Sequence, residues 1–221
     1  MSTALRNDRQ AAQFPSEQFQ NLAITVIGTG AIGRQVGLQL AAIGVPSVTL
    51  FDHDRVETQN LGNQGWNTGD VGRFKVKVME RDMRAKCQDM VITTHARRFN
   101  PAEDQLGNVV FICVDSIVTR SDIWESAKLP EQSLYVDGRM HAETFQIVTV
   151  ADGSEEDCAY YRRTLFTADE AFHGSCTSRS TIFTSNIVSG FMVGQMSLWL
   201  RGLPLKRDFV CNTMTQDIFV P

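Results

Sequence analysis

The chain has 221 residues, a mass of 24.7 kDa, 43% hydrophobic residues and a formal charge of −4. This length suits one large α/β domain with a substantial core, and two independent domains would be cramped. The pI near 5.6 gives no basic footprint for RNA or DNA, so we expect a protein or small-molecule partner.

Cysteine usage and hydropathy favour a soluble cytoplasmic protein. The five cysteines form no C-x-x-C pair, which argues against both a disulfide framework and a zinc clip. The N-terminus lacks the continuous apolar core of a signal peptide, and no stretch approaches about 18 uninterrupted apolar residues. We therefore expect no membrane attachment.

The first predicted element is a polar arm over residues 1–20, which contains the run Arg6-Asn7-Asp8-Arg9-Gln10. Residues 22–27 are apolar and predict a strand that leads into a glycine turn, Gly28-Thr29-Gly30-Ala31-Ile32-Gly33. Glycines at this spacing permit a tight turn and let backbone N–H groups approach a phosphate at the N-terminus of the next helix. The turn indicates a nucleotide site, with a close helix–strand turn that binds no ligand as the alternative.

An acidic residue follows the second predicted strand. A helix over 31–43 stops at Gly44-Val45-Pro46 and is followed by a strand over 47–51. Asp52 stands 52 − 33 = 19 residues after the last glycine, where a carboxylate is expected to bond ribose hydroxyls. This pattern serves NAD as well as adenosine phosphates, so it does not choose between them.

The rest of the chain predicts an α/β, Rossmann-like fold with a mostly parallel sheet, helices on both faces and a C-terminal antiparallel portion. Asp70 is the expected N-cap of a helix that ends near Ala85. The crossover region, residues 151–180, is polar and too long for an idle connection, so it is either mobile or functional. Further strands are expected over 90–96, 108–114, 133–136 and 144–150, helices over 116–127 and 181–200, and a terminal strand or hairpin over 209–220.

The loop after Asp52 is more polar than a grip on a nicotinamide cofactor requires. It reads D-H-D-R-V-E-T-Q-N-L-G-N-Q over residues 52–64, followed by D-V-G-R-F-K over residues 70–75. These residues resemble the family of ThiF, MoeB and HesA and the adenylation domains of ubiquitin-activating enzymes, whose pattern is D-x-D-x-V-x-x-S-N-L-x-R-Q followed by D-x-G-x-x-K. The resemblance extends from Arg6 to about Val150, and more loosely to Leu200.

This resemblance implies an ATP site built from several parts of one ThiF-like adenylation domain. The family's phosphate-binding turn corresponds to Gly28, Gly30, Ala31 and Gly33, its ribose aspartate to Asp52, and its phosphate-contacting residues to Asn60, the Asn63 position and Lys75. Asp115 matches the family aspartate that handles Mg²⁺. Arg9 resembles the arm arginine that reaches the nucleotide of a neighbouring subunit, so the resemblance also implies a homodimer.

Adenylation makes chemical sense of these residue types. A carboxylate that attacks the α-phosphate of ATP brings two anions together, so the site must supply cations and oriented N–H groups. Lys75, Arg9 and an Mg²⁺ ion on Asp115 would supply them. Each residue also has a plainer interpretation: a solvated surface lysine, a flexible arm charge, and an N-cap for the helix after Asp115.

The chain departs from the family pattern at Asn63, where the family has arginine, so one phosphate clamp is missing. Either Arg55, Arg73 or a partner's arginine substitutes for it, or ATP binds weakly. The paired zinc ligands of many members are absent, so no structural zinc is expected. Cys176 is the candidate for a thiolate that receives the activated carboxyl group, with Cys158 as second choice and adenylate as the only intermediate as the alternative.

The leading hypothesis is an adenylyltransferase that activates the C-terminal carboxylate of a small ubiquitin-like or sulfur-carrier protein and releases pyrophosphate. The alternative, prompted by Asn63, is a non-catalytic subunit or pseudoenzyme that binds a carrier or a second adenylating subunit. An NAD-dependent oxidoreductase shares the glycine turn and Asp52, but it leaves Asn60, Lys75 and Arg9 without roles.

Overall fold

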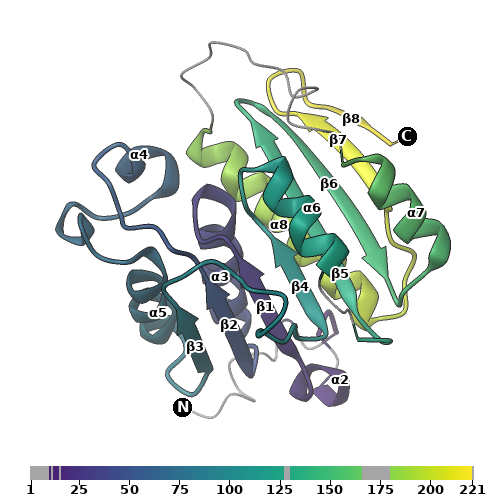
Figure 1. Ribbon diagram of the computed structural model, residues 1–221, viewed down its shortest axis with the longest axis horizontal. Helices are drawn as coiled ribbons and strands as arrows, with labels where there is room; N and C mark the ends of the chain where they lie inside the picture. Colours follow the sequence, from purple (N-terminus) through teal and green to yellow (C-terminus); the bar gives the residue numbers. More distant parts are fainter. Residues whose placement is uncertain (1–9, 11, 15, 127–129, 166–179, 221) are drawn as a thin grey trace.

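The computed structural model describes residues 10, 12–14, 16–126, 130–165 and 180–220 (Figure 1). Its centre is an eight-stranded sheet in the order β3-β2-β1-β4-β5-β6-β7-β8. The first five strands of that order pair in parallel, and the last three join antiparallel. The predicted α/β fold with an antiparallel C-terminal portion is confirmed. The strands are β1 (Ala23–Ile27), β2 (Ser47–Phe51), β3 (Val91–His95), β4 (Val109–Ile112), β5 (Leu134–His141), β6 (Thr144–Ala151), β7 (Asp208–Asn212) and β8 (Asp217–Phe219).

Helices cover both faces of the sheet (Figure 1). Helices α3, α5 and α8 share one face, where α3 packs between the other two, and α6 and α7 lie on the opposite face. The helices are α2 (Ser16–Gln20), α3 (Ala31–Ile43), α4 (Asn60–Gln64), α5 (Lys75–Lys86), α6 (Ile117–Ser126), α7 (Glu155–Arg163) and α8 (Ile182–Leu200), with a 3-10 turn η1 at Thr68–Asp70. None of the helices in the described part of the chain is both long enough and apolar enough to cross a membrane.

Two hydrophobic cores form because successive side chains of a strand point to opposite faces. On one face Val26 of β1 joins a cluster with Met192 of α8. On the other face Ile27, the next residue, joins a cluster with Trp124 of α6 and Tyr161 of α7. All five side chains are buried, and each contributes about 1.5–3 kcal/mol by leaving water. The two cores hold the sheet between its two layers of helices.

The helix predicted to follow an N-cap at Asp70 begins at Lys75, four residues later than expected. Asp70 ends the 3-10 turn η1, where its carboxylate accepts hydrogen bonds from the Asn67 backbone N–H and from Arg81. Gly72 then takes a φ of +86°, and α5 begins at Lys75. The prediction that Asp70 is the N-cap of this helix is therefore wrong, because a left-handed glycine separates the turn from the helix.

Two further elements differ from their predicted bounds. Strand β5 continues from Leu134 to His141, because β6 pairs with it along its whole length. The region predicted as a polar crossover, residues 151–180, contains helix α7, whose N-cap Ser154 accepts a hydrogen bond from Asp157 N–H. The acidic residues 155–157, which the sequence suggested as part of a polar loop, form the first turn of this helix. Their negative charges interact favourably with the positive end of the helix dipole.

Candidate functional site: the crevice at the glycine turn

The glycine turn lies where three parallel strands end side by side. The last residue of β1, Ile27, pairs with Phe51 of β2 and with Ile112 of β4. Hydrogen bonds to both neighbouring strands fix the backbone where it leaves β1: Gly28 N–H donates to Phe51 O (2.9 Å), and Cys113 N–H donates to Ile27 O (2.8 Å). The order of strands reverses at β1, and open α/β sheets bind ligands at the carboxyl ends of the strands at such a point.

Packing explains two of the glycines. Gly28 has a φ of +89°, and a Cβ there would lie 2.7 Å from Cys113 O. A Cβ on Gly33 would lie 1.8 Å from Gly28 O, so only glycine lets α3 approach the strand end this closely. These contacts fix the direction in which the first turn of α3 points.

Gly30 and Ala31 present the open side of the turn. The nearest atom to a Cβ built on Gly30 is Gln64 Nε2 at 3.9 Å, which is ordinary contact. Gly30 is the N-cap of α3 and no side chain caps it, while Ala31 is the first helical residue. The backbone N–H groups of the first turn therefore have no intrahelical partner, and this geometry favours an anion such as a phosphate.

Asp52 does more than the sequence predicted, because it holds the glycine turn itself. Its Oδ2 accepts from Thr29 N–H (2.7 Å) and from the Thr29 hydroxyl (2.9 Å), and its Oδ1 accepts from Asp54 N–H (2.8 Å). A carboxylate offers about four lone-pair sites, so a ribose hydroxyl can still bond here. The contact with Thr29 was not predicted, since a threonine between two glycines carries no signal of its own.

Lys75 is a buried lysine with a carboxylate partner. Its ammonium lies 2.8 Å from Asp54 Oδ2, and its side chain is only 7% exposed. Burial opposes ionisation of Asp54, but the hydrogen bond and charge of Lys75 outweigh burial and lower the pKa of Asp54. The interpretation of Lys75 as a solvated surface residue is wrong. A continuous polar chain thus runs from Thr29 through Asp52 and Asp54 to Lys75.

Asn60 and Asn63 lie on α4, which faces the glycine turn through Gln64. The Asn60 side chain accepts from Glu57 N–H (3.1 Å) and so fixes the start of this helix. Asn63 donates to the Ser180 hydroxyl (2.8 Å), while its carbonyl oxygen is buried without a hydrogen-bond donor among the described residues. Asn63 therefore ties α4 to the segment just before α8 and keeps one unused acceptor.

Arg55, one of the residues expected to substitute for the missing arginine, is held by its own loop. Arg55 donates to Gly72 O (2.7 Å), and its guanidinium lies over the Phe74 ring. Arg34, which the sequence did not single out, is buried: it donates to Gly65 O (2.9 Å) and pairs with Asp82 (3.0 Å). Both arginines support the backbone of the loop.

Asp115 is exposed just beyond the end of β4, two residues after the Cys113 carbonyl that contacts Gly28. It is not the cap of α6, because the Ser116 hydroxyl accepts from Thr119 N–H (3.2 Å). Among the described residues, Asp52, His53 and Asp54 are the only three metal-ligating groups whose ligand atoms all lie within 4.8 Å of one another. Mg²⁺ with a nucleotide commonly takes one or two carboxylates and phosphate oxygens, so an isolated Asp115 fits that donor set.

A buried ionic cluster lies at the adjacent strand end, and sequence reasoning missed it. Asp137 of β5 is fully buried and pairs with Arg120 (2.8 Å) and Arg139 (2.8 Å). Burial raises the pKa of this carboxyl group, but the two arginines outweigh burial and lower it. Arg139 also donates to the backbone and hydroxyl oxygens of Thr164 (2.9 Å each), which anchors the end of α7.

Two predicted catalytic residues, Arg9 and Cys176, lie outside the described residues. Burial raises the pKa of both Cys113 and Cys158, so neither is a ready thiolate. Neither Cys113 nor Cys158 is therefore a candidate for the thiolate that receives the activated carboxyl group.

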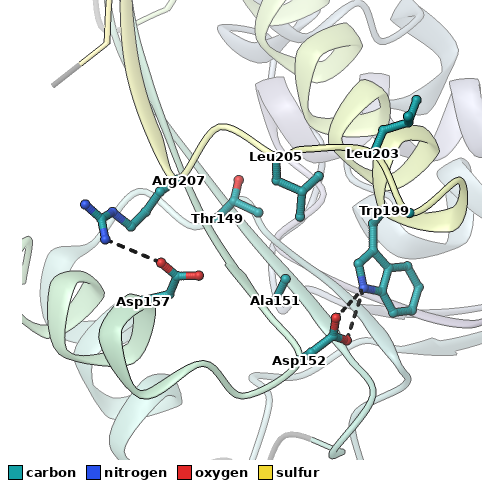
Figure 2. Close-up of a pocket in the computed structure, with 9 residues that line it drawn as sticks. Thr149, Ala151, Asp152, Asp157, Trp199, Leu203, Leu205 and Arg207 are labelled. Carbon is teal, nitrogen blue, oxygen red and sulfur yellow. Dashed lines mark hydrogen bonds and ion pairs between the residues drawn. The ribbon is translucent and has the colours of Figure 1, made fainter.

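A separate cavity of about 440 Å³ lies at the opposite end of the parallel strands from the glycine turn (Figure 2). Ala151, in its lining, pairs with Leu134 at the amino end of β5, whereas the glycine turn lies at the carboxyl ends. Its charged groups are already paired: Asp152 accepts from the Trp199 indole (3.1 Å), and Arg207 pairs with Asp157 (3.6 Å). This cavity is not part of the crevice at the glycine turn.

The fold and the site define an α/β protein with a glycine turn at the carboxyl end of β1, an acidic residue after β2 and a buried lysine. The chain belongs to the ThiF family, whose family model matches residues 7–215. Because the match covers the glycine turn, Asp52, Lys75 and Asp115 together, the resemblance seen in the motifs is confirmed.

Its relatives include activating enzymes and an adenylyltransferase. The chain is 29% identical over 227 residues to ubiquitin-like modifier-activating enzyme 5 of Drosophila ananassae, covering 92% of this chain and 57% of that protein. It is 30% identical over 105 residues to the sulfur carrier protein ThiS adenylyltransferase of Escherichia coli, covering 45% of this chain and 42% of that protein. The chain thus spans less than two thirds of the length of these relatives.

Solved structures share the fold at low identity. The crystal structure of E. coli MccB with ATP superimposes with a TM-score of 0.71 at 15% identity, covering 95% of this chain and 65% of that chain. The microcin C7 biosynthetic enzyme MccB in complex with N-formylated MccA gives a TM-score of 0.75 at 14% identity, with 95% and 66% coverage. These likenesses establish a common architecture.

Proposed function

We propose that the chain adenylates the C-terminal carboxylate of a small ubiquitin-like or sulfur-carrier protein with Mg·ATP and releases pyrophosphate. The observation that carries the proposal is the chain of polar contacts Thr29–Asp52–Asp54–Lys75. It joins the uncapped N-terminus of α3 to a buried lysine at the carboxyl ends of the parallel strands. The ThiS adenylyltransferase and the activating enzyme among the relatives supply the substrate class.

In this reaction a carboxylate oxygen attacks the α-phosphorus, and the bond to the pyrophosphate oxygen breaks. The backbone N–H groups after Gly30 would hold phosphate oxygens, and Asp52 would bond the ribose while it keeps Thr29 in place. Mg²⁺, held by Asp115 when bound, would neutralise part of the charge on the leaving pyrophosphate. Lys75 would share its ammonium between Asp54 and a phosphate oxygen, because three N–H donors are available.

The resemblance of residues 6–10 to the family arm implies that Arg9 of a neighbouring copy would reach this site, so a homodimer is part of the proposal, and we expect it in the cytoplasm. Cys176 is the residue we assign to any covalent acyl transfer after adenylation, with the adenylate itself as the sole intermediate otherwise. A Cys176→Ser variant that retains pyrophosphate exchange but loses a thioester-linked carrier would support this assignment, whereas loss of neither activity would remove Cys176 from the reaction.

A second function is favoured by Asn63. The family arginine is missing there, and the guanidinium groups of Arg55 and Arg34 are engaged with the backbone carbonyls of Gly72 and Gly65. The loss of this arginine is expected of a pseudoenzyme that binds a carrier or another adenylating subunit without binding ATP. Calorimetry with Mg·ATP separates the two functions, because saturable binding at one nucleotide per chain is expected only of the enzyme.

The direct test of adenylation is exchange of labelled pyrophosphate into ATP in the presence of ubiquitin-like and sulfur-carrier proteins with a C-terminal glycine. Carrier-dependent exchange is the expected result, and its absence with every carrier would contradict the proposal. An NAD-dependent oxidoreductase is the third function, and it ranks last because it gives Lys75 and Asn60 no role. Fluorescence titration with NADH tests it.

A further inference from the structure

A buried threonine lies between the first two glycines of the turn and donates twice to Asp52. Thr29 is 0% exposed and Asp52 is 9% exposed. The Thr29 backbone N–H donates to Asp52 Oδ2 at 2.7 Å, and the Thr29 hydroxyl lies 2.9 Å from the same oxygen. An ionised carboxylate only accepts hydrogen bonds, so the hydroxyl is the donor in this contact. Thr29 therefore places two donors on one oxygen.

The number of lone pairs limits what Asp52 can still accept. The two oxygens of a carboxylate offer about four acceptor positions together, about two on each oxygen. Thr29 occupies both positions on Oδ2, and the Asp54 N–H occupies one on Oδ1 at 2.8 Å. One acceptor position, on Oδ1, is therefore left for a ligand.

The backbone around this contact keeps the two residues in place. Gly28, with a φ of +89°, donates its N–H to Phe51 O at 2.9 Å, which ties the turn to the residue before Asp52. The Asp52 N–H donates in turn to His95 O at 3.2 Å. If the Thr29 hydroxyl turned away from Asp52, it would be buried without this acceptor, which is unfavourable. The contact should therefore persist when a ligand binds.

We propose that Thr29 restricts Asp52 to a single ribose hydroxyl of the bound nucleotide, accepted at Oδ1. A ribose carries neighbouring 2′ and 3′ hydroxyls, and a carboxylate with a free position on each oxygen can accept both. Here Oδ2 is already occupied by Thr29. Thr29 is a positioning residue, because it acts on the nucleotide through Asp52. The inference rests on the proposed function, since it concerns ATP in the same crevice.

The consequence is a site that recognises one ribose hydroxyl and tolerates the loss of the other. Without the hydroxyl that Asp52 accepts, Oδ1 loses a partner in a site that is largely closed to water. Because hydrogen bonds to charged groups are the stronger class, binding should weaken by about tenfold. Loss of the other hydroxyl removes no bond to Asp52, so it should change the affinity by less than about threefold.

The test is calorimetric titration of the full chain with the Mg²⁺ complexes of ATP, 2′-deoxyATP and 3′-deoxyATP. In the wild-type chain one deoxy analogue should bind within about threefold of ATP, and the other about tenfold more weakly than ATP. Thr29→Val removes the hydroxyl, keeps the backbone N–H and frees one position on Oδ2. Both deoxy analogues should then bind more weakly than ATP. Thr29→Ser keeps a hydroxyl and should show the wild-type pattern.

Thr25→Val is the matched control. Thr25 is a buried threonine of β1, and its hydroxyl accepts from the Gly107 N–H at 2.9 Å. This variant loses a buried hydroxyl but leaves the donors to Asp52 unchanged, so the ratios of the three affinities should stay those of the wild type. The affinities are compared within each variant, so a general loosening of the chain affects all three nucleotides alike. Circular dichroism melting confirms that each variant is folded.

Equal weakening of both deoxy analogues in the wild-type chain, or no weakening of either, would overturn the inference alone, because ATP would still bind. A Thr29→Val variant that keeps the wild-type pattern would also overturn it. If Thr29→Val does not fold, the wild-type chain and Thr29→Ser decide, since both must distinguish the two analogues. No binding of ATP by the wild-type chain would overturn the proposed function and this inference together.

Discussion

Replacement of Lys75 by methionine should weaken the site without unfolding the chain. Methionine has similar length and removes only the ammonium, which lies 2.8 Å from Asp54 Oδ2 in a side chain that is 7% exposed. Asp54 is 49% exposed, so water replaces most of its lost partner, and the free energy of unfolding should fall by less than about 1 kcal/mol. The variant therefore isolates the role of the charge.

The effect on nucleotide chemistry should be larger. Two unit charges about 4 Å apart interact with about 4 kcal/mol at an effective dielectric constant of about 20. Asp54 already takes part of that interaction, so we assign about 2 kcal/mol to a phosphate, which corresponds to about a 30-fold loss. Carrier-dependent pyrophosphate exchange should fall by that factor, and calorimetry should show weaker binding of Mg·ATP.

Lys77→Met is the matched control. Lys77 lies two residues further along α5, is 58% exposed and pairs with Glu80 at 3.2 Å. This control should keep exchange within about twofold of the wild type, because an exposed ion pair contributes about 0.2–1 kcal/mol. If Lys75→Met retained wild-type exchange, or if both variants lost it equally, the assignment of Lys75 to the phosphates would be refuted.

Three further predictions concern the turn, the missing arginine and acid stability. Gly33→Ala should abolish Mg·ATP binding and cost about 1–3 kcal/mol of folding free energy, because its Cβ would lie 1.8 Å from Gly28 O. Gly69→Ala is the control and should do neither, because a Cβ there meets nothing within 4 Å. Equal calorimetric titrations of the two variants with Mg·ATP would contradict this prediction. Asn63→Arg should tighten Mg·ATP binding by about tenfold, as one charge-assisted hydrogen bond contributes about 1.5–3 kcal/mol, and weaker binding would argue against a clamp there. The lowered pKa values of Asp70 and Asp137 mean that the unfolded chain binds more protons near pH 4, so urea unfolding should show stability that is constant near pH 7 and lost as the pH falls below about 5. Stability that rises towards pH 4 would contradict the ion pairs of these two carboxylates.

Local sequence patterns were sufficient for the frame of the site. Apolar runs located β1, β2 and β4, and the glycines at 28, 30 and 33 located the turn between β1 and α3. Asp52 was placed correctly because its spacing from the glycines reflects one strand–helix–strand unit. Each of these signals lies within about 30 residues of chain, over which local propensity and periodicity operate.

The partners of the site residues could not be predicted, because they depend on tertiary placement. Asp54 meets Lys75 only after the loop between them folds back through η1, and no spacing rule relates the two. Asp137 meets Arg120 because β4 and β5 pair in a particular register. The wrong N-cap at Asp70 has the same origin, since an acidic residue before a helical pattern also suits a 3-10 turn.

The most direct test of the account is a calorimetric titration of the chain with ATP in the presence of Mg²⁺. Saturable binding at one nucleotide per chain, lost in Gly33→Ala and kept in Gly69→Ala, is the predicted result. No heat of binding in the wild-type chain, or binding that Gly33→Ala leaves unchanged, would contradict the assignment of the glycine-turn crevice as an ATP site.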